Sequence, residues 1–347
     1  MTTISSISEL LSLSGSQFRI YDIGRKINKI SKESFSKIEL NQLPYPYPMQ
    51  SHACLAIVFW QKNSIQPFLW FVKIPLDERG LLNQGARNHY IAIIVEALGK
   101  DITETPSEKQ EELLKENPYH FTPAQYKLAA LNSIINVELK RDMSEHFTLF
   151  MQYISGALGW SNWQKIGVQG INDFAAKIND VDNAKTLTQA LHFLPEQVLS
   201  PLCVALENQP LSLPLIQAII NALTLPNNRF SDETNNNLLR SLASTSKHPL
   251  VVSYIDSKLQ QRDQLTTNTL IIFSGRLWDA LDSSDTLLNF FEAIAKQEDL
   301  ALFIEIFKDL VAIPSIRPKV FEVMRSPQRS EALSLAIGHI FQTTKQG

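Results

Sequence analysis

Hydrophobic and polar residues follow two different patterns along the chain, and the change comes near residue 120. Before it, three segments rich in β-branched and aromatic residues, each bounded by turn-forming residues, have the pattern of strands. The last two are joined by a six-residue polar link and are therefore predicted to pair antiparallel. Helices are predicted between the first two strands and after the third. The predicted strands are 17–24, 53–60 and 67–76, and the predicted helices are 28–43 and 83–98.

From Phe121 onward, apolar residues recur at helical spacing and strand-like alternation is almost absent. Prolines fall where a first helical turn tolerates them, as at Pro214 and Pro249, and Ser231 and Ser284 precede acidic residues that suit a helix start. The predicted helices lie near 122–140, 146–156, 162–178, 184–193, 197–207, 214–224, 232–244, 249–261, 267–281, 284–297, 299–312, 316–325 and 330–343.

Pairs of these helices recur about every 30 to 36 residues, which is the range of stacked helical hairpins. We therefore predict an α+β protein in which a small antiparallel-sheet module is followed by an irregular, HEAT-like array of helical repeats. A compact, non-repetitive helical bundle is the alternative. The predicted domains are an α+β module at 1–99, a charged linker at 100–120 and an all-α array at 121–347.

Composition narrows the class of protein. Charged residues make up 19% of the 347, hydrophobic residues make up 44%, and the formal net charge is -3. Binding to phosphate backbones needs an excess of basic residues, so nucleic acid is not the expected partner. The only cysteines, Cys54 and Cys203, lie in apolar segments far apart, which favours buried, reduced thiols. We expect a cytoplasmic protein without a membrane span.

Motifs that bind cofactors or metals are missing from the sequence. Its 12 glycines form no G-x-G-x-x-G, and the segment from Gly80 to Arg87 lacks the lysine and hydroxyl of a phosphate loop. No two of the seven histidines are three to five residues apart, and no cysteine stands at ligand spacing from them. The sequence therefore predicts no cofactor, no metal site and no catalytic residue that can be named.

One concentration of polar and aromatic groups remains, in the N-terminal module. The segment from Pro44 to Pro48 alternates proline with tyrosine and can continue neither a helix nor a sheet, so it is either a docking segment for a partner or a stiff connector packed on its own domain. Candidate ligand- or partner-binding residues in this module are Arg25, Tyr45, Tyr47, His52 and Arg87.

These segments also carry a resemblance. FRIYDIGRKI followed by PYPYP, then AIVFW and PFLWFVKIPLDERGLL, resembles a family of bacterial proteins known only as a domain of unknown function. The resemblance covers nearly the whole chain and implies a helical C-terminal part. It carries over no catalytic or binding residue.

Two functions compete on this evidence. The first is a non-enzymatic interaction or scaffold protein that binds a protein partner on its helical surfaces. The second is an enzyme or ligand-binding domain that uses a cleft between the N-terminal module and the helical array, lined by the candidate residues above.

Overall fold

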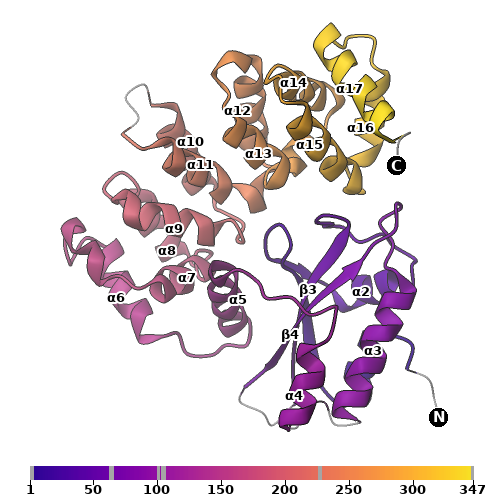
Figure 1. The fold of residues 1–347 in the computed structure, drawn as a ribbon. Helices are drawn as coiled ribbons and strands as arrows, with labels where there is room; N and C mark the ends of the chain where they lie inside the picture. The colour runs from indigo at the N-terminus through magenta and orange to yellow at the C-terminus, as the bar shows by residue number, and fades with distance from the viewer. Residues whose placement is uncertain (1–3, 62–65, 100–101, 103–106, 226–228, 345–347) are drawn as a thin grey trace. The chain divides into compact units, whose positions relative to one another are not determined.

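The computed structural model describes residues 4–61, 66–99, 102, 107–225 and 229–344. The chain divides into two compact units, 1–124 with 311–315 and the rest of the chain, and each is described by itself. The first contains the sheet and the second is helical (Figure 1). The predicted α+β class, with a small sheet module followed by a helical array, is confirmed.

A four-stranded antiparallel sheet forms the first unit. The predicted pairing of the last two strands is confirmed, with Val58 opposite Leu69. Most of the polar link between these strands, residues 62–65, lies outside the described residues. The strands, in the order β2-β1-β3-β4, are β1 (Gln17–Asp22), β2 (Asn28–Ile30), β3 (His52–Trp60) and β4 (Phe68–Pro75).

Strand β2 corrects the sequence prediction, which placed a helix over 28–43. Ile30 lies opposite Ile20 of β1, so the first residues of that range extend the sheet. The helix α2 (Lys32–Glu39) begins only after Ser31, whose hydroxyl accepts a hydrogen bond from the Ser34 N–H at 3.0 Å. Three residues carry too little periodicity to reveal a strand, and pairing with β1 decides their conformation.

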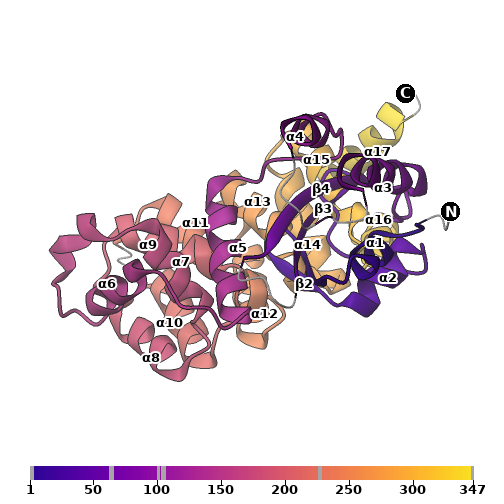
Figure 2. The ribbon, with the colours of Figure 1, turned by 90° about the horizontal axis from the view of Figure 1, so that it is seen from below.

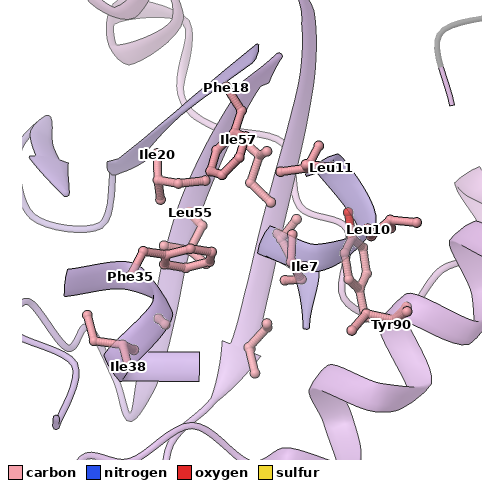
Figure 3. Close-up of a cluster of buried hydrophobic side chains, with 14 of the residues drawn as sticks. Ile7, Leu10, Leu11, Phe18, Ile20, Phe35, Ile38, Leu55, Ile57 and Tyr90 are labelled. Carbon is pink, nitrogen blue, oxygen red and sulfur yellow. The ribbon is translucent and has the colours of Figure 1, made fainter. Parts of the chain in front are cut away.

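The core of the first unit lies on one face of the sheet. Side chains of α1 (Ile7–Leu13), α2 and α3 (Gln84–Leu98) converge there on residues of β1 and β3 (Figure 3). Phe35, Leu55 and Ile57 are fully buried. Each such side chain contributes about 1.5–3 kcal/mol relative to an exposed one. The buried set includes Ile7, Leu10, Leu11, Phe18, Ile20, Phe35, Ile38, Leu55, Ile57 and Tyr90.

The segment predicted as a linker includes ordered structure that belongs to the first unit. Helix α4 (Glu108–Lys115) contacts α3. The Lys73 N–H of β4 donates to the Tyr119 carbonyl at 2.7 Å, and Val72 forms a bridge with His120. The backbone of 119–120 therefore pairs with β4, which is an edge strand of the sheet. The pattern of charges in the sequence does not reveal this contact.

Each predicted helical range of the second unit has a helical counterpart, with ends that differ by a few residues. The largest differences are at 162–178, where a short 3-10 helix, Trp160–Lys165, precedes a helix that starts only after Gly167, and at 267–281, where the helix ends at Gly275 and a 3-10 helix, Trp278–Leu281, follows. The helices are α5 (Gln125–Glu138), α6 (Glu145–Ile154), α7 (Val168–Ala176), α8 (Val181–Ala190), α9 (Glu196–Leu206), α10 (Leu213–Thr224), α11 (Asp232–Ser241), α12 (Pro249–Gln260), α13 (Thr267–Gly275), α14 (Ser284–Ala295), α15 (Leu300–Ala312), α16 (Arg317–Arg325) and α17 (Glu331–Thr344).

Most helices of this unit contact the helix two places further along the chain. The odd-numbered helices from α5 to α13 form one row, and the even-numbered helices from α6 to α16 form a second row (Figures 1 and 2). Neither row could bury its apolar stripe alone, because each amphipathic helix needs neighbours on its apolar face. The second unit is therefore an array of stacked helices in chain order.

Acidic side chains join helices of this array at their N-termini. The Ser231 N–H donates to Glu196 Oε1 at 2.9 Å, and its hydroxyl donates to Oε2 at 2.5 Å. Ser330 bonds Glu292 in the same way, with 2.8 and 2.6 Å. The first N–H groups of a helix have no partner within the helix, so each carboxylate supplies the acceptor that they lack.

A buried ionic cluster connects three helices of the odd-numbered row. Glu207, 1% exposed, follows α9, and its carboxylate accepts from Arg240 of α11 and from Arg276 Nε at 2.9 Å. Tyr126 lies beneath the Arg240 guanidinium, 5.2 Å from ring centroid to Cζ. Because this one carboxylate bonds guanidinium groups from two other helix ends, it fixes the three helix ends relative to each other.

Candidate functional site

The Pro44–Pro48 segment is anchored to the first unit through Tyr45. This side chain is fully buried, and its hydroxyl donates to Asp22 Oδ1 at 2.6 Å at the end of β1. Its backbone N–H donates to the Gly80 carbonyl at 2.8 Å. Burial and the neighbouring Asp22 carboxylate raise the pKa of Tyr45 well above its ordinary value. The phenol therefore stays neutral and acts as a hydrogen-bond donor.

Two more of the predicted site residues lie at the same segment. Arg25 is buried, and its Nε donates to the Pro48 carbonyl at 3.0 Å. The half-buried Tyr47 ring meets the Tyr45 ring edge-on, with centroids 6.5 Å apart. The structure thus brings Arg25, Tyr45 and Tyr47 together around one proline-rich segment. These contacts fit the connector hypothesis, in which the tyrosines pack on their own domain.

His52 is positioned by a tight turn at the start of β3. Met49 and His52 exchange two backbone hydrogen bonds of 3.0 Å, and the central residues Gln50 and Ser51 have φ values of 48° and 59°. Positive φ at both central positions is typical of the hairpin turn that matches strand twist. The His52 Nδ1 lies 2.6 Å from the Gln50 carbonyl, so the ring is held by the turn.

Arg87 connects other parts of the unit. Its guanidinium, near the start of α3, donates to the Glu39 backbone carbonyl and, at 2.8 Å, to Asn88 Oδ1. The Glu39 carboxylate is buried and accepts from the Ile7 N–H at 2.6 Å and the Ser8 hydroxyl at 2.5 Å. Burial raises the pKa of Glu39, against the effect of these hydrogen bonds and of the Arg87 charge. Arg87 thus helps to hold α1, α2 and α3 together.

A pocket of about 220 Å³ lies between β4, α3 and α4, at residues that the sequence analysis did not single out. Aromatic side chains form part of its wall. Among them, the Trp70 and Tyr90 rings meet edge-on with centroids 6.4 Å apart. It forms where α4 and the residues after it meet α3 and β4, so the linear pattern offered no signal. The lining residues are Leu69, Trp70, Phe71, Tyr90, Ile94, Glu111, Leu114, Asn117 and His120.

Further pockets lie among the described residues of the helical unit. One of about 440 Å³ lies beside α8 and the segment that leads into α10, and its lining is mostly apolar. Val181, in this lining, is 81% exposed. Another, of about 170 Å³, lies among α11, α12 and α13 and is mostly polar. Each combines residues from separate helices, so helical periodicity alone could not predict it.

Reactive and metal-binding groups are sparse in the part of the chain that the structure describes. Both cysteines are buried and free, and burial raises the pKa of Cys203 to about 12, so this thiol stays protonated at neutral pH. Among the described residues, no three His, Cys, Asp or Glu side chains are grouped as metal ligands. No described helix has both the length and the apolar character required to cross a bilayer.

Comparison with known proteins shows which family the chain belongs to. Neither the curated proteins nor the solved structures contain a match to this chain. A family model does match residues 2–341, which is nearly the whole chain and spans both units. Its description, protein of unknown function (DUF3549), agrees with the resemblance of the N-terminal segments. The chain therefore belongs to the DUF3549 family of proteins of unknown function.

Proposed function

We propose that this protein is a non-enzymatic scaffold that binds a protein partner on its helical surfaces. The observation that carries the proposal is the apolar pocket of about 440 Å³ beside α8 and α10, whose rim is exposed. Val181 is 81% exposed and Leu213, next to the lining residues Ser212 and Pro214, is 54% exposed. Apolar side chains gathered around a hollow are typical of surfaces that receive side chains of a partner.

The stacked rows of helices support the same proposal. Repeated stacking produces long surfaces on which a partner can contact several successive helices, and we describe the array as irregular and HEAT-like on this basis. The occupant we propose for the pocket is an aliphatic side chain of a folded or extended protein segment. Its apolar lining would exclude water around such a side chain.

The enzymatic or ligand-binding alternative has weaker support. It requires Arg25, Tyr45 or Arg87 to reach a substrate, yet each of these side chains already hydrogen-bonds within the first unit. Their bonds to backbone carbonyls and to a buried carboxylate suit structural roles. We therefore favour the scaffold, and the alternative stays a hypothesis.

The test places a photo-crosslinking amino acid at Val181 in the full chain, expressed in its source organism. A protein captured there is then purified and its affinity measured for wild type, Val181→Glu and the control Leu335→Glu, another exposed apolar position on α17. We expect Val181→Glu to weaken binding about tenfold or more, since a buried charge without a partner costs more than 1.4 kcal/mol. Leu335→Glu should bind as wild type does.

Two results would overturn the proposal. One is the absence of any captured protein above the background of the unmodified chain. The other is equal affinity of both glutamate variants for the captured protein, because the contact would then not involve the pocket beside α8.

A further inference from the structure

The pocket of about 220 Å³ between β4, α3 and α4 has an apolar wall with an open aromatic surface. Trp70, Ile94 and Leu114 contribute to this wall from the strand and from both helices. Trp70 is only half-buried, although the Phe59 ring packs against it at 4.5 Å between centroids and the Tyr90 ring meets it edge-on. Part of the indole surface is therefore available to a ligand in the pocket that it lines.

Asn117, which follows α4 and lines the pocket, gives the first indication of a ligand. The residue is only 6% exposed. Its Oδ1 accepts from the Tyr119 N–H at 2.9 Å, but its amide NH₂ group donates no hydrogen bond to the described part of the chain. The amide nitrogen is not sealed within the protein, so it can be reached from the pocket. Because side chains this deeply buried usually bond a partner, the pocket has to supply one.

Tyr90 gives a second indication of the same kind. This residue of α3 is 2% exposed and lines the pocket, and its hydroxyl bonds no described residue and is not sealed off either. The Trp70 indole N–H is likewise without a hydrogen bond among the residues that the structure describes. All three groups can donate, so the pocket favours a ligand that carries acceptor atoms. A cation would face the positive ends of these donors and is disfavoured.

The charges around the pocket disfavour an anion as well. Its described lining contains no lysine or arginine, and its one carboxylate belongs to Glu111, an exposed residue of α4. Phosphate and carboxylate ligands are usually held by basic side chains, and Glu111 would repel them. The ligand that suits this lining is therefore neutral, with an apolar face and acceptor atoms at its edge.

We propose that this pocket binds the base of a nucleoside. A nucleobase is flat, aromatic and neutral, and proteins hold such bases by stacking on aromatic side chains and by hydrogen bonds to their edges. Trp70 would stack on the base, while the Asn117 amide and the Tyr90 hydroxyl would donate to its acceptor atoms. A volume of about 220 Å³ accommodates one base. This inference does not rest on the scaffold function, which concerns a pocket of the helical unit.

The experiment titrates the full chain with adenosine, guanosine, cytidine and uridine, by calorimetry and by tryptophan fluorescence. We expect at least one nucleoside to bind saturably and to quench part of the fluorescence, because stacking brings the base onto the Trp70 ring. The chain has five tryptophans, so Trp70→Phe identifies the quenched one. The quench should disappear in Trp70→Phe and persist in the control Trp60→Phe, which replaces a residue of β3 outside the pocket lining.

Two further variants assign the hydrogen bonds. Tyr90→Phe removes only a hydroxyl that bonds no described residue, so it should weaken binding about threefold to tenfold without lowering the Tm of the free protein. Asn117→Asp keeps an oxygen for the Tyr119 N–H but removes the amide donors, and should weaken binding about tenfold or more. Tyr254→Phe, at a buried tyrosine of the helical unit, is the control and should bind as wild type does.

Nucleoside monophosphates and a single-stranded tetranucleotide distinguish a free nucleoside from a base within a nucleic acid. Both should bind more weakly than the nucleoside with the same base, because the described lining offers no basic group to a phosphate and Glu111 repels it. The proposal is overturned if no nucleoside binds, if the phosphorylated probes bind as tightly or more tightly, if Trp70→Phe keeps the quench, or if Tyr90→Phe and Asn117→Asp bind as the control does.

Discussion

Glu39 in the sheet unit and Glu196 in the helical array make nearly the same hydrogen bonds, but the pKa of one carboxyl group is raised and that of the other is lowered. Each carboxylate accepts hydrogen bonds from a backbone N–H and a serine hydroxyl at the start of another helix. Burial raises the pKa of Glu39, whereas the hydrogen bonds from Ser231 and Thr234 lower the pKa of Glu196.

The cause of the difference is the surroundings of each carboxylate. Glu39 is fully buried beneath α1, where loss of water disfavours its charge more than its hydrogen bonds favour it. Glu196 is only half-buried at the start of α9, so its hydrogen bonds dominate. The same type of helix cap therefore disfavours the charged carboxylate where it is fully buried and favours it where it is partly exposed to water.

The largest expected effect is that of Glu39→Ala, which leaves the Ile7 N–H and the Ser8 N–H and hydroxyl without their acceptor. We expect a loss of about 2 kcal/mol in the free energy of unfolding of the first unit, because buried donors are left unsatisfied. Urea unfolding followed by circular dichroism measures it. The exposed Glu33→Ala on the same helix is the control, and equal stability of the two variants would contradict this account.

Glu196→Ala should have a smaller effect. Its partner Ser231 keeps its own cap on the Thr234 N–H at 3.3 Å, so only the contact from α9 is lost. We expect a loss of about 1 kcal/mol, which is typical of an N-terminal cap. The same denaturation assay applies, with the exposed neighbour Gln197→Ala as control. A loss larger than that of Glu39→Ala would reverse the comparison.

The smallest effect is a pair of opposite pH dependences. The folded protein binds the Glu39 proton more tightly than the unfolded chain does, so this group's contribution to stability falls as the pH rises from about 4.5 through the raised pKa. For Glu196 the sign is opposite, and its contribution is lost as the pH falls below about 4.5 through the lowered pKa.

Glu39→Gln and Glu196→Gln, compared with wild type at a series of pH values, measure the two contributions. Each variant should remove the pH-dependent part that its carboxylate supplies, and the two difference curves should slope in opposite directions. Difference curves of the same sign would show that burial does not distinguish the two sites.

Local patterns predicted most elements because their causes are local. Helix α16 starts at Arg317 and ends at Arg325, close to the predicted 316–325, since a proline in the first turn and helical spacing of apolar residues mark it. The structure brings the candidate residues Arg25, Tyr45 and Tyr47 together at the proline-rich segment, a grouping that the sequence pattern did not predict. Their partners, Asp22 and the Pro48 carbonyl, depend on how the segment crosses the end of β1.

Other features depend on contacts between distant residues. The strand at Asn28–Ile30 exists because Ile30 pairs with Ile20, and the pocket of about 170 Å³ exists because α11, α12 and α13 meet.

The sequence by itself determined the α+β class, the change of pattern near residue 120 and the position of nearly every helix, because periodicity and caps are properties of neighbouring residues. Only the tertiary structure decided which carboxylates are buried, which helices stack two places apart and which side chains line each pocket. Burial and close approach of distant residues set desolvation and hydrogen bonding, and neither is encoded in any short stretch of the chain.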